Sequence, residues 1–427
     1  MTLPPSYDLL WRLARPALPF ILNRRAAAGK EDRARIAERF GQLGERSNLP
    51  ASPIWIHAVS VGESVGAVAL ARALRTRQPD IPLLITTNTV TAATRIAAQP
   101  AELALTHLYQ PLDHPGMVDA FLRTVRPRLA LFLESDFWPN LITRTAAADV
   151  PVAFVSAQLS NRAFARWQRQ RHLAKSVFGT PDLVLAVDSE QQGRFADLGT
   201  DPQNVHIGGS LKLPPVRSDK DDDLMAMLRQ AAGDRRILLA ASTHEGEDNA
   251  VIEAAEALGD GWFTIIAPRH PERGGAVASQ CEGAGHKAAR RGAGGSAQPG
   301  DSIYIADTLG EMNSLFSVAD IVFLGGSLKP LGGHNPVEPA AHGLPIITGP
   351  HTDKNRAEFA GLMAAGVVSE IADAAELAAT ASQIVDDPGK LARIARAARD
   401  YASQTGKRPE FAADFCLGLI DRTGSKS

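Results

Sequence analysis

Short apolar runs alternate with longer helical stretches along most of this chain. From residue 54 onward, runs rich in β-branched residues are separated by alanine-rich stretches such as Ser64–Arg77 and His114–Val125. This alternation is typical of βαβ units, in which helices cover a buried parallel sheet. The strands predicted in the first half are Ile54–Val59, Leu83–Thr87, Leu129–Leu133, Val152–Val155 and Leu183–Val187, and a short strand at Val205–Ile207 follows them.

The same pattern starts again in the second half. The strands predicted there are Ile237–Ala241, Phe263–Ala267, Ile303–Ala306, Ile321–Leu324 and Pro345–Thr348. A chain of 427 residues exceeds what one hydrophobic core usually supports. We therefore expect an α/β protein with two Rossmann-like domains facing across a cleft, 41–205 and 206–427, and a separate N-terminal segment, 1–40. Ligands of such sheets bind at the carboxyl ends of the strands.

The first residues form an amphipathic pattern. Polar Asp8, Arg12 and Arg15 fall opposite an apolar helical face. The apolar face comprises Leu10, Leu13, Ala14, Ala17, Leu18 and Ile21. Residues 1–39 hold 8 basic and 4 acidic side chains, and the apolar run is too short and too interrupted to span a bilayer. The pattern favours a helix lying on an anionic membrane surface, with Trp11 at headgroup level. A helix packed on the domain's own core is the alternative.

Overall composition narrows the class of protein. The formal net charge is −2, so no global basic field favours nucleic acid as a partner. Cys281 and Cys416 are far apart and in no metal-ligand spacing, which predicts free thiols in a reducing compartment. We expect neither a metal nor another cofactor.

Glu63 is the first candidate catalytic residue. It lies in the run 57–66, after a predicted strand and beside the start of a helix, and so at the expected cleft. A carboxylate there can remove a proton from an attacking hydroxyl. The alternative is an acidic residue that only complements the helix dipole.

Two further loops follow strands in the first half. Glu134 to Asn140 places two carboxylates and Trp138 at a strand end, which suits sugar hydroxyls and ring faces. The alternative is a loop with a buried Trp138 and acids that cap the next helix. The run Ser156 to Ser160, with Gln158, can line the acceptor side in the same way.

The second half offers two candidate phosphate-binding loops. Ser242 and Thr243 follow a strand, where their hydroxyls and nearby backbone N–H groups can approach a phosphate. A simple N-cap, completed by a later glutamate, is the alternative. Arg269 and His270 follow the next strand and suit a phosphate or a nucleobase edge. A charged surface loop without function is the alternative there.

The run from Gly325 to Ala340 carries most of the functional signal. Its glycines, among them Gly326, Gly332 and Gly333, let backbone approach a ligand closely. Asn335 is predicted as an N-cap that directs a helix end at a phosphate, and Glu338 as an acceptor for ribose hydroxyls. Turn chemistry alone explains neither His334 nor Glu338.

These runs together resemble the 3-deoxy-D-manno-octulosonic acid (Kdo) transferases of lipid A assembly. The resemblance implies a GT-B fold, a CMP-Kdo donor, a lipid A precursor as acceptor, and a membrane-associating N-terminus at the cytoplasmic face of the bacterial inner membrane. The matching stretches are Glu38-Arg39-Phe40-Gly41, His57–Glu63, Glu134–Asn140, Ala241–Gly246, Pro268–Arg273, Asp307–Glu311, Gly325–Ser327, Gly332–Ala340 and Gly349-Pro350-His351.

The resemblance also assigns roles to residues. Glu63 matches the family's proposed general base, and Lys212 matches a lysine of its interdomain stretch. The resulting donor-binding candidates are Lys212, Ser242, Thr243, Arg269, His270, Gly326, Gly332, Gly333, Asn335 and Glu338, and the acceptor-binding candidates are Glu134, Trp138 and Gln158. The expected chemistry is direct displacement with inversion, with positive groups stabilising the departing CMP phosphate.

The chain departs from the family pattern on the acceptor side. Gln158 stands where the family usually has an arginine, which removes a cation from that half of the site. A relative with another acceptor therefore remains an alternative, as do a sugar-nucleotide epimerase of the same fold and a binding module without activity.

Overall fold

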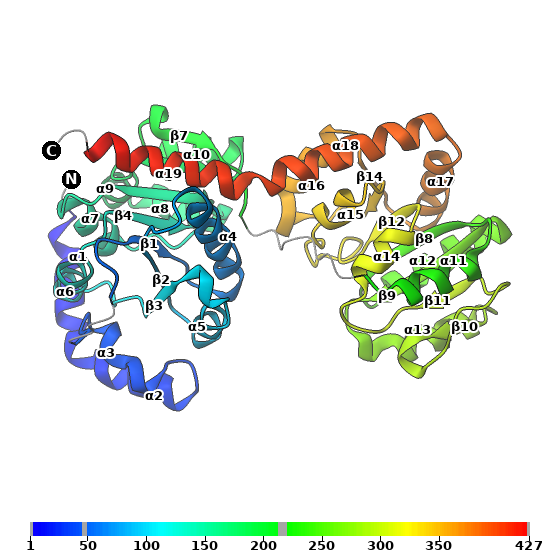
Figure 1. Cartoon of the computed structure of the whole chain (residues 1–427), viewed down its shortest axis with the longest axis horizontal. Coiled ribbons are helices and arrows are strands. Elements are labelled where there is room, and N and C mark those ends of the chain that lie inside the picture. Colours follow the sequence, from blue (N-terminus) through cyan, green and yellow to red (C-terminus); the bar gives the residue numbers. More distant parts are fainter. Residues whose placement is uncertain (1–2, 45–48, 212–219, 425–427) are drawn as a thin grey trace. The chain divides into compact units, whose positions relative to one another are not determined.

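The computed structural model describes residues 3–44, 49–211 and 220–424. The chain divides into two compact units: unit 1, Met1–Pro214 with Lys407–Ser427, and unit 2, Pro215–Gly406. In the described part of the chain each unit contains a parallel sheet of seven strands covered by helices (Figure 1). The two predicted Rossmann-like sheets are therefore confirmed. None of the described helices is long and apolar enough to cross a membrane.

The sheet of unit 1 has the order β3-β2-β1-β4-β5-β6-β7, so the strand order reverses beside β1. Its central strands are buried on both faces, which explains their continuous apolar sequence. The strands are β1 (Ile54–His57), β2 (Leu83–Thr87), β3 (Leu105–Tyr109), β4 (Leu129–Leu133), β5 (Val152–Ala157), β6 (Leu183–Ala186) and β7 (Val205–Ile207).

Helices cover both faces of this sheet. Side chains of α4 and α19 contribute to one buried apolar cluster, and those of α6, α7, α9 and α10 to the other. The helices of unit 1 are α1 (Pro5–Ala14), α2 (Leu18–Ala27), α3 (Ile36–Arg39), α4 (Val61–Arg77), α5 (Val90–Ala97), α6 (Pro115–Val125), α7 (Pro139–Ala147), α8 (Asn161–Arg169), α9 (Arg171–Phe178), α10 (Ser189–Leu198) and α19 (Arg408–Gly424).

The sheet of unit 2 has the order β10-β11-β9-β8-β12-β13-β14. Its strands are β8 (Arg236–Thr243), β9 (Trp262–Pro268), β10 (Ala288–Arg290), β11 (Ile303–Ile305), β12 (Ile321–Leu324), β13 (Ile346–Thr348) and β14 (Val368–Glu370). Its helices are α11 (Asp222–Ala232), α12 (Glu247–Leu258), α13 (Gly274–Gly283), α14 (Met312–Val318), α15 (Val337–Ala341), α16 (Arg356–Ala364), α17 (Ala374–Val385) and α18 (Pro388–Gly406).

The C-terminal helix corrects the predicted domain boundary. The sequence pattern predicts one domain over 206–427, but α19 belongs to unit 1, where Ala412, Ala413 and Cys416 are buried in the core beside α4. An ion pair between Arg77 and Asp414 also joins α19 to α4. The apolar pattern of α19 predicts a docked helix equally well on either sheet, so only tertiary packing selects unit 1.

The predicted segment 1–40 is not separate from the first domain either. Glu38 accepts a hydrogen bond from the backbone N–H of Tyr109 at 2.7 Å, and the Arg39 guanidinium donates to Asn88 at 2.8 Å. Both Glu38 and Arg39 are buried. The residues around α3 therefore belong to the folded body of unit 1.

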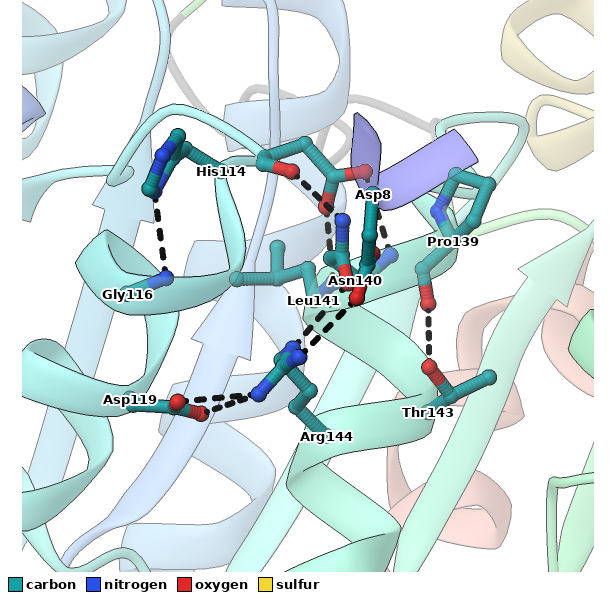
Figure 2. A network of polar contacts seen from close by, with 10 residues as sticks. Asp8, His114, Gly116, Asp119, Pro139, Asn140, Leu141, Thr143 and Arg144 are labelled. Carbon is teal, nitrogen blue, oxygen red and sulfur yellow. Dashed lines mark hydrogen bonds and ion pairs between the residues drawn. The ribbon is translucent and has the colours of Figure 1, made fainter. Parts of the chain in front are cut away.

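A polar network attaches α1 to α6 and α7. The Tyr7 hydroxyl donates to the Asp113 carboxylate at 2.7 Å. Figure 2 shows the Arg144 guanidinium between Asp119 and Asp8. It forms ion pairs with Asp119 at 2.8 Å and with Asp8 at 3.2 Å. Thus α1 is held by its polar residues. Leu10 and Leu13, placed on its apolar face by the sequence pattern, are 67% and 70% exposed.

Candidate active site

Three loops of unit 1 gather at the carboxyl edge of adjacent strands. They follow β1, β4 and β5, which are neighbours in the sheet in that order. These loops carry Glu63, Glu134 and Gln158, so parallel strand pairing places all three predicted residues at one edge, as expected.

Glu63 lies in the first turn of α4, whose N-cap is Ser60. Its Oε2 accepts a hydrogen bond from the backbone N–H of Val59 at 2.5 Å. Among the described residues, no group donates a hydrogen bond to its Oε1. Burial and then the negative charge of Glu134 raise the pKa of Glu63 above its ordinary value, although the Val59 hydrogen bond opposes this shift. Glu63 thus does interact with the start of α4, as the alternative interpretation predicts. This interaction leaves one carboxylate oxygen for an incoming hydroxyl.

A buried histidine stands beside this carboxylate. His57 is fully buried, and its Nε2 lies 3.3 Å from Asp136 Oδ2 while its Nδ1 lies 2.9 Å from the Thr86 hydroxyl. The indole N–H of Trp138 donates to the same Asp136 oxygen at 2.5 Å. Trp138 is half-buried, and its hydrogen bond orients the Asp136 carboxylate toward His57.

Glu134 has an unusual backbone conformation. Its φ is +60°, in the left-handed region that non-glycine residues rarely adopt. The conformation is held because the Glu134 N–H donates to the carbonyl of Val155 and its own carbonyl accepts from the N–H of Gln158. The Gln158 amide also donates to Glu134 Oε2 at 3.3 Å. Backbone strain of this kind concentrates where a side chain must point in a particular direction.

The acids of this loop do not cap the helix that follows, so that alternative is wrong. The cap of α7 comes instead from Asp113, which accepts the backbone N–H groups of Asn140 and Leu141 at 3.1 Å and 2.7 Å. Asp113 is 1% exposed, and burial raises its pKa to about 7. The role of Asp113 is not predictable from the sequence, because a cap from a distant segment leaves no local pattern.

The candidate donor residues of unit 2 also lie on neighbouring strands. The loops after β9, β8 and β12 carry them, and these strands are adjacent in that order. The backbone N–H of Arg269 donates to the Thr243 carbonyl, and that of Gly325 to the Ala241 carbonyl. All three loops are therefore held together by backbone hydrogen bonds.

Three histidines meet where these loops join. The rings of His244 and His334 stack with centroids 5.1 Å apart, and their Nε2 atoms are 2.9 Å apart. His270 meets His244 edge-on at 5.9 Å. Burial, with the charges of His244 and Arg269, lowers the pKa of His334 to about 4, so it is neutral at pH 7. A Cβ at Gly326 would come within 3.1 Å of the His334 ring, so glycine leaves room for this ring.

A buried carboxylate fixes the glycine-rich loop. Glu247 is fully buried, and its two oxygens accept backbone N–H groups at 2.7–2.9 Å. These donors belong to His244, Gly326, Ser327 and Leu328. Because α12 begins at Glu247, this single side chain ties the loop after β12 to the start of that helix.

The alternative interpretation, an N-cap supplied by Ser242 or Thr243, is wrong. The N-cap of α12 is Gly246, and the buried Thr243 hydroxyl donates to Asp248 at 2.7 Å. Ser242 has φ +58° and is half-buried. Of the two predicted donor residues, Ser242 is therefore the one whose side chain reaches the surface.

The end of the glycine-rich run partly matches its predicted geometry. Gly332 and Gly333 have φ of +92° and +71°, as their glycine identity predicts. Asn335 Oδ1 accepts the N–H of Val337 at 3.0 Å, so its capping bond is present, but α15 starts at Val337 and is only five residues long. Burial raises the pKa of Glu338 above its ordinary value, and Asn335 and Arg269 oppose this.

The described residues supply two clusters, one in each unit. Lys212, the remaining predicted donor residue, lies outside the described residues. Within those residues no group of three or more His, Cys, Asp or Glu side chains is arranged to hold a metal ion.

The fold places the chain among proteins built from two Rossmann-like units. A UDP-GlcNAc 2-epimerase from Neisseria meningitidis, solved with UDP-GlcNAc, covers 88% of this chain and all of its own, with TM-score 0.56 and 12% identity. A 2-epimerase structure from Listeria monocytogenes gives TM-score 0.57 at 14% identity, over 88% of this chain and 98% of its own. At such identities these similarities establish the architecture, a GT-B type of fold, and nothing about the reaction.

Sequence comparison identifies the particular family. Residues 34–214 match the family model described as 3-deoxy-D-manno-octulosonic-acid transferase. The Bordetella pertussis Kdo transferase is 35% identical over 93% of this chain and 95% of its own length. The Haemophilus influenzae enzyme is 33% identical over 81% and 82%. The chain belongs to the 3-deoxy-D-manno-octulosonic acid transferase family, a family of glycosyltransferases.

Proposed function

We propose that this protein moves Kdo from CMP-Kdo to a lipid A precursor, with inversion and with Glu63 as the general base. The observation that carries the proposal is the position of Glu63 at the carboxyl edge of the unit 1 sheet. There it is largely buried and has a raised pKa. A base with a raised pKa binds the proton it removes more tightly, which favours abstraction from a weakly acidic hydroxyl.

In the proposed reaction Glu63 Oε1 takes the proton of the acceptor hydroxyl as its oxygen attacks the anomeric carbon of Kdo. The bond from that carbon to the phosphate oxygen breaks, and CMP leaves with the electron pair. Glu134, Trp138 and Gln158 are the proposed acceptor contacts, because they follow β4 and β5, the two strands next to β1 on one side of the sheet.

Unit 2 supplies the proposed CMP site. Arg269 is exposed and carries charge close to both His334 and Glu338, since it shifts the pKa of each. A guanidinium suits phosphate oxygens because its donors form paired hydrogen bonds. Glu338 is the proposed acceptor for ribose hydroxyls, while Ser242 and His270 complete the polar surface. Lys212, outside the described residues, is kept as a proposed donor contact on the family resemblance alone. The backbone at Gly326, Gly332 and Gly333 permits close approach.

Incubation with CMP-Kdo and a tetraacylated lipid A precursor tests the proposal, with products read by mass spectrometry. Release of CMP together with a Kdo-bearing lipid is expected. CMP-Kdo consumed with no change in the lipid would contradict the lipid acceptor. Epimerised donor sugar would favour the epimerase alternative, and binding without turnover would favour a binding module.

Loss of the Arg269 guanidinium is expected to weaken donor binding selectively. Arg269→Ala should raise KM for CMP-Kdo about thirtyfold, equivalent to about 2 kcal/mol for a charge-assisted contact to phosphate. KM for the acceptor should stay unchanged, because the acceptor residues lie in the other unit. Steady-state kinetics with each substrate varied in turn measures both constants.

Arg393→Ala is the control for this measurement. Arg393 is equally charged and exposed but lies within α18, outside the loops after β8, β9 and β12. A rise in acceptor KM as large as that in donor KM would show that Arg269 does not act through CMP.

We further propose that α1 and α2 bind the surface of the bacterial inner membrane at its cytoplasmic face. Leu10, Leu13 and Phe20 are 67%, 70% and 72% exposed, an unusual exposure for large apolar residues that lie close together in sequence. Arg12 and Arg24 are exposed beside them and can contact anionic headgroups. The polar network at Tyr7 and Asp8 would hold α1 in place. The alternative interpretation is a helix whose apolar face packs on the core of the domain. Of the large apolar residues in α1 and α2, only Leu18 and Leu22 are buried in that way.

Flotation with vesicles of phosphatidylglycerol and phosphatidylethanolamine tests the membrane proposal. The variant Leu10→Ser/Leu13→Ser/Phe20→Ser should lose most of its binding, since each exposed side chain contributes on the order of 1–2 kcal/mol on insertion. Point changes are preferable to deleting 1–40, because Glu38 and Arg39 belong to the core of unit 1. The control Ile207→Ser/Leu309→Ser changes exposed apolar residues elsewhere and should float normally. Equal flotation of both variants would disprove a membrane contact at α1 and α2.

A further inference from the structure

One segment of unit 1 concentrates positive charge in a chain whose net charge is −2. Residues 161–175 contain five basic side chains and no acidic one. All five are exposed. They are Arg162, Arg166, Arg169, Arg171 and Lys175. The local excess therefore lies on the surface, where it faces solvent.

Three of these arginines share one face of α8. Arg162, Arg166 and Arg169 are spaced by four and three residues, which aligns them along a helix. The opposite face is apolar: the Trp167 ring packs edge-on against Phe178 with centroids 5.0 Å apart. A hollow of about 480 Å³ lies along the arginine face. Its lining residues are Ser160, Arg162, Ala163, Ala165, Arg166 and Arg169.

In the described part of the chain these three arginines have no acidic partner, as is also the case for other exposed arginines of unit 1 such as Arg15 and Arg95. Among the described residues, no ion pair involves Arg162, Arg166 or Arg169, whereas Arg144 pairs with Asp119 and Arg194 with Glu190. Three guanidinium groups on one helix face repel one another at short range. A ligand with several negative charges would relieve this repulsion, and its oxygens could accept paired N–H donors.

The position of α8 connects this surface to the proposed acceptor site. The helix starts one residue after its N-cap Ser160, directly beyond Gln158 at the carboxyl end of β5. Its first turn therefore begins at the edge of the sheet that carries Glu134 and Glu63. Gln158 itself brings no charge, so cations for an anionic acceptor must come from elsewhere.

We infer that Arg162, Arg166 and Arg169 form a binding site for a phosphate group of the acceptor lipid's sugar headgroup. The inference rests on the proposed function and names the part of the acceptor that unit 1 recognises. A phosphomonoester is the favoured ligand because three guanidinium groups along one hollow match its charge and oxygen geometry. Anionic phospholipid of the membrane is the competing source of the same chemistry.

The variant Arg162→Gln/Arg166→Gln/Arg169→Gln tests the inference in the full-length protein. With a bisphosphorylated tetraacyl disaccharide as acceptor, KM for the acceptor should rise at least about tenfold, with kcat and KM for CMP-Kdo unchanged. When the acceptor lipid lacks the phosphate that the arginines bind, wild type and variant should have the same KM for the acceptor. Both monophosphoryl lipids, lacking either phosphate, are therefore assayed.

The matched control is Arg95→Gln/Arg393→Gln/Arg396→Gln, which removes the same charge from exposed arginines on α5 and α18. It should behave as wild type. An unchanged acceptor KM in the α8 variant, or an equal rise with all three lipids, would overturn the inference. Loss of flotation on phosphatidylglycerol vesicles without acceptor would assign the arginines to the membrane instead. Failure of the wild type to transfer Kdo at all would contradict the proposed function itself, so the two failures are distinguishable.

Discussion

Glu63→Gln is expected to lower kcat by about a thousandfold while leaving CMP affinity near normal, the usual range for loss of a general base. Glutamine keeps the size of the side chain, and its amide oxygen can still accept the Val59 N–H. It cannot take up the proton of the acceptor hydroxyl. Single-turnover transfer assays measure the chemical step, and isothermal titration with CMP measures binding.

The pH dependence supplies a second readout for the same variant. Burial and the Glu134 charge raise the pKa of Glu63, and the base works only when ionised. The wild-type rate should therefore fall as pH decreases, with a midpoint above that of an ordinary glutamate. Glu102→Gln, which neutralises an exposed glutamate of unit 1, should keep both the rate and this profile. Transfer by Glu63→Gln at the wild-type rate would show that another group is the base.

Glu247→Ala is expected to destabilise unit 2 by about 4 kcal/mol, because it leaves four backbone N–H groups without their buried acceptor. The loss should concentrate in the loop after β12, so CMP affinity should fall as well. Urea denaturation measures the stability, and hydrogen exchange of the Gly326, Ser327 and Leu328 amides locates the change.

Glu245→Ala is the control for this prediction. Glu245 lies two residues away and is exposed, so its substitution should change the free energy of unfolding by no more than about 0.5 kcal/mol. Unchanged exchange of the three amides in Glu247→Ala would show that the loop is held by other contacts.

The strands that sequence analysis found are the buried ones. Leu129–Leu133 and Ile321–Leu324 match the structure residue for residue, since a strand buried on both faces needs a continuous apolar run. Strands β3, β10 and β14 were missed. The first residues of β3 are half-exposed, and β10 lies at a sheet edge without a fully buried residue, so their sequences lack that signal.

The candidate site residues divide in the same way. Residues in the loop or first helical turn after a buried strand, such as Glu63, Glu134 and Arg269, could be predicted because parallel strands bring their carboxyl ends to one edge. Residues that hold those loops could not. Asp113 caps a helix 26 residues further on, and Glu247 binds a loop 79 residues further on, so neither leaves a local pattern.

The order of apolar and polar residues along the chain is enough to specify two parallel α/β sheets, the loops that carry their chemistry, and the glycines those loops require. These are consequences of local periodicity and backbone freedom, which act over a few residues. Long-range packing settles the rest. It places α19 on unit 1, turns Leu10 and Leu13 outward while Tyr7 and Asp8 hold α1, and stacks His244 on His334. Each of these contacts joins residues far apart in sequence, so their energies arise only once the chain has folded.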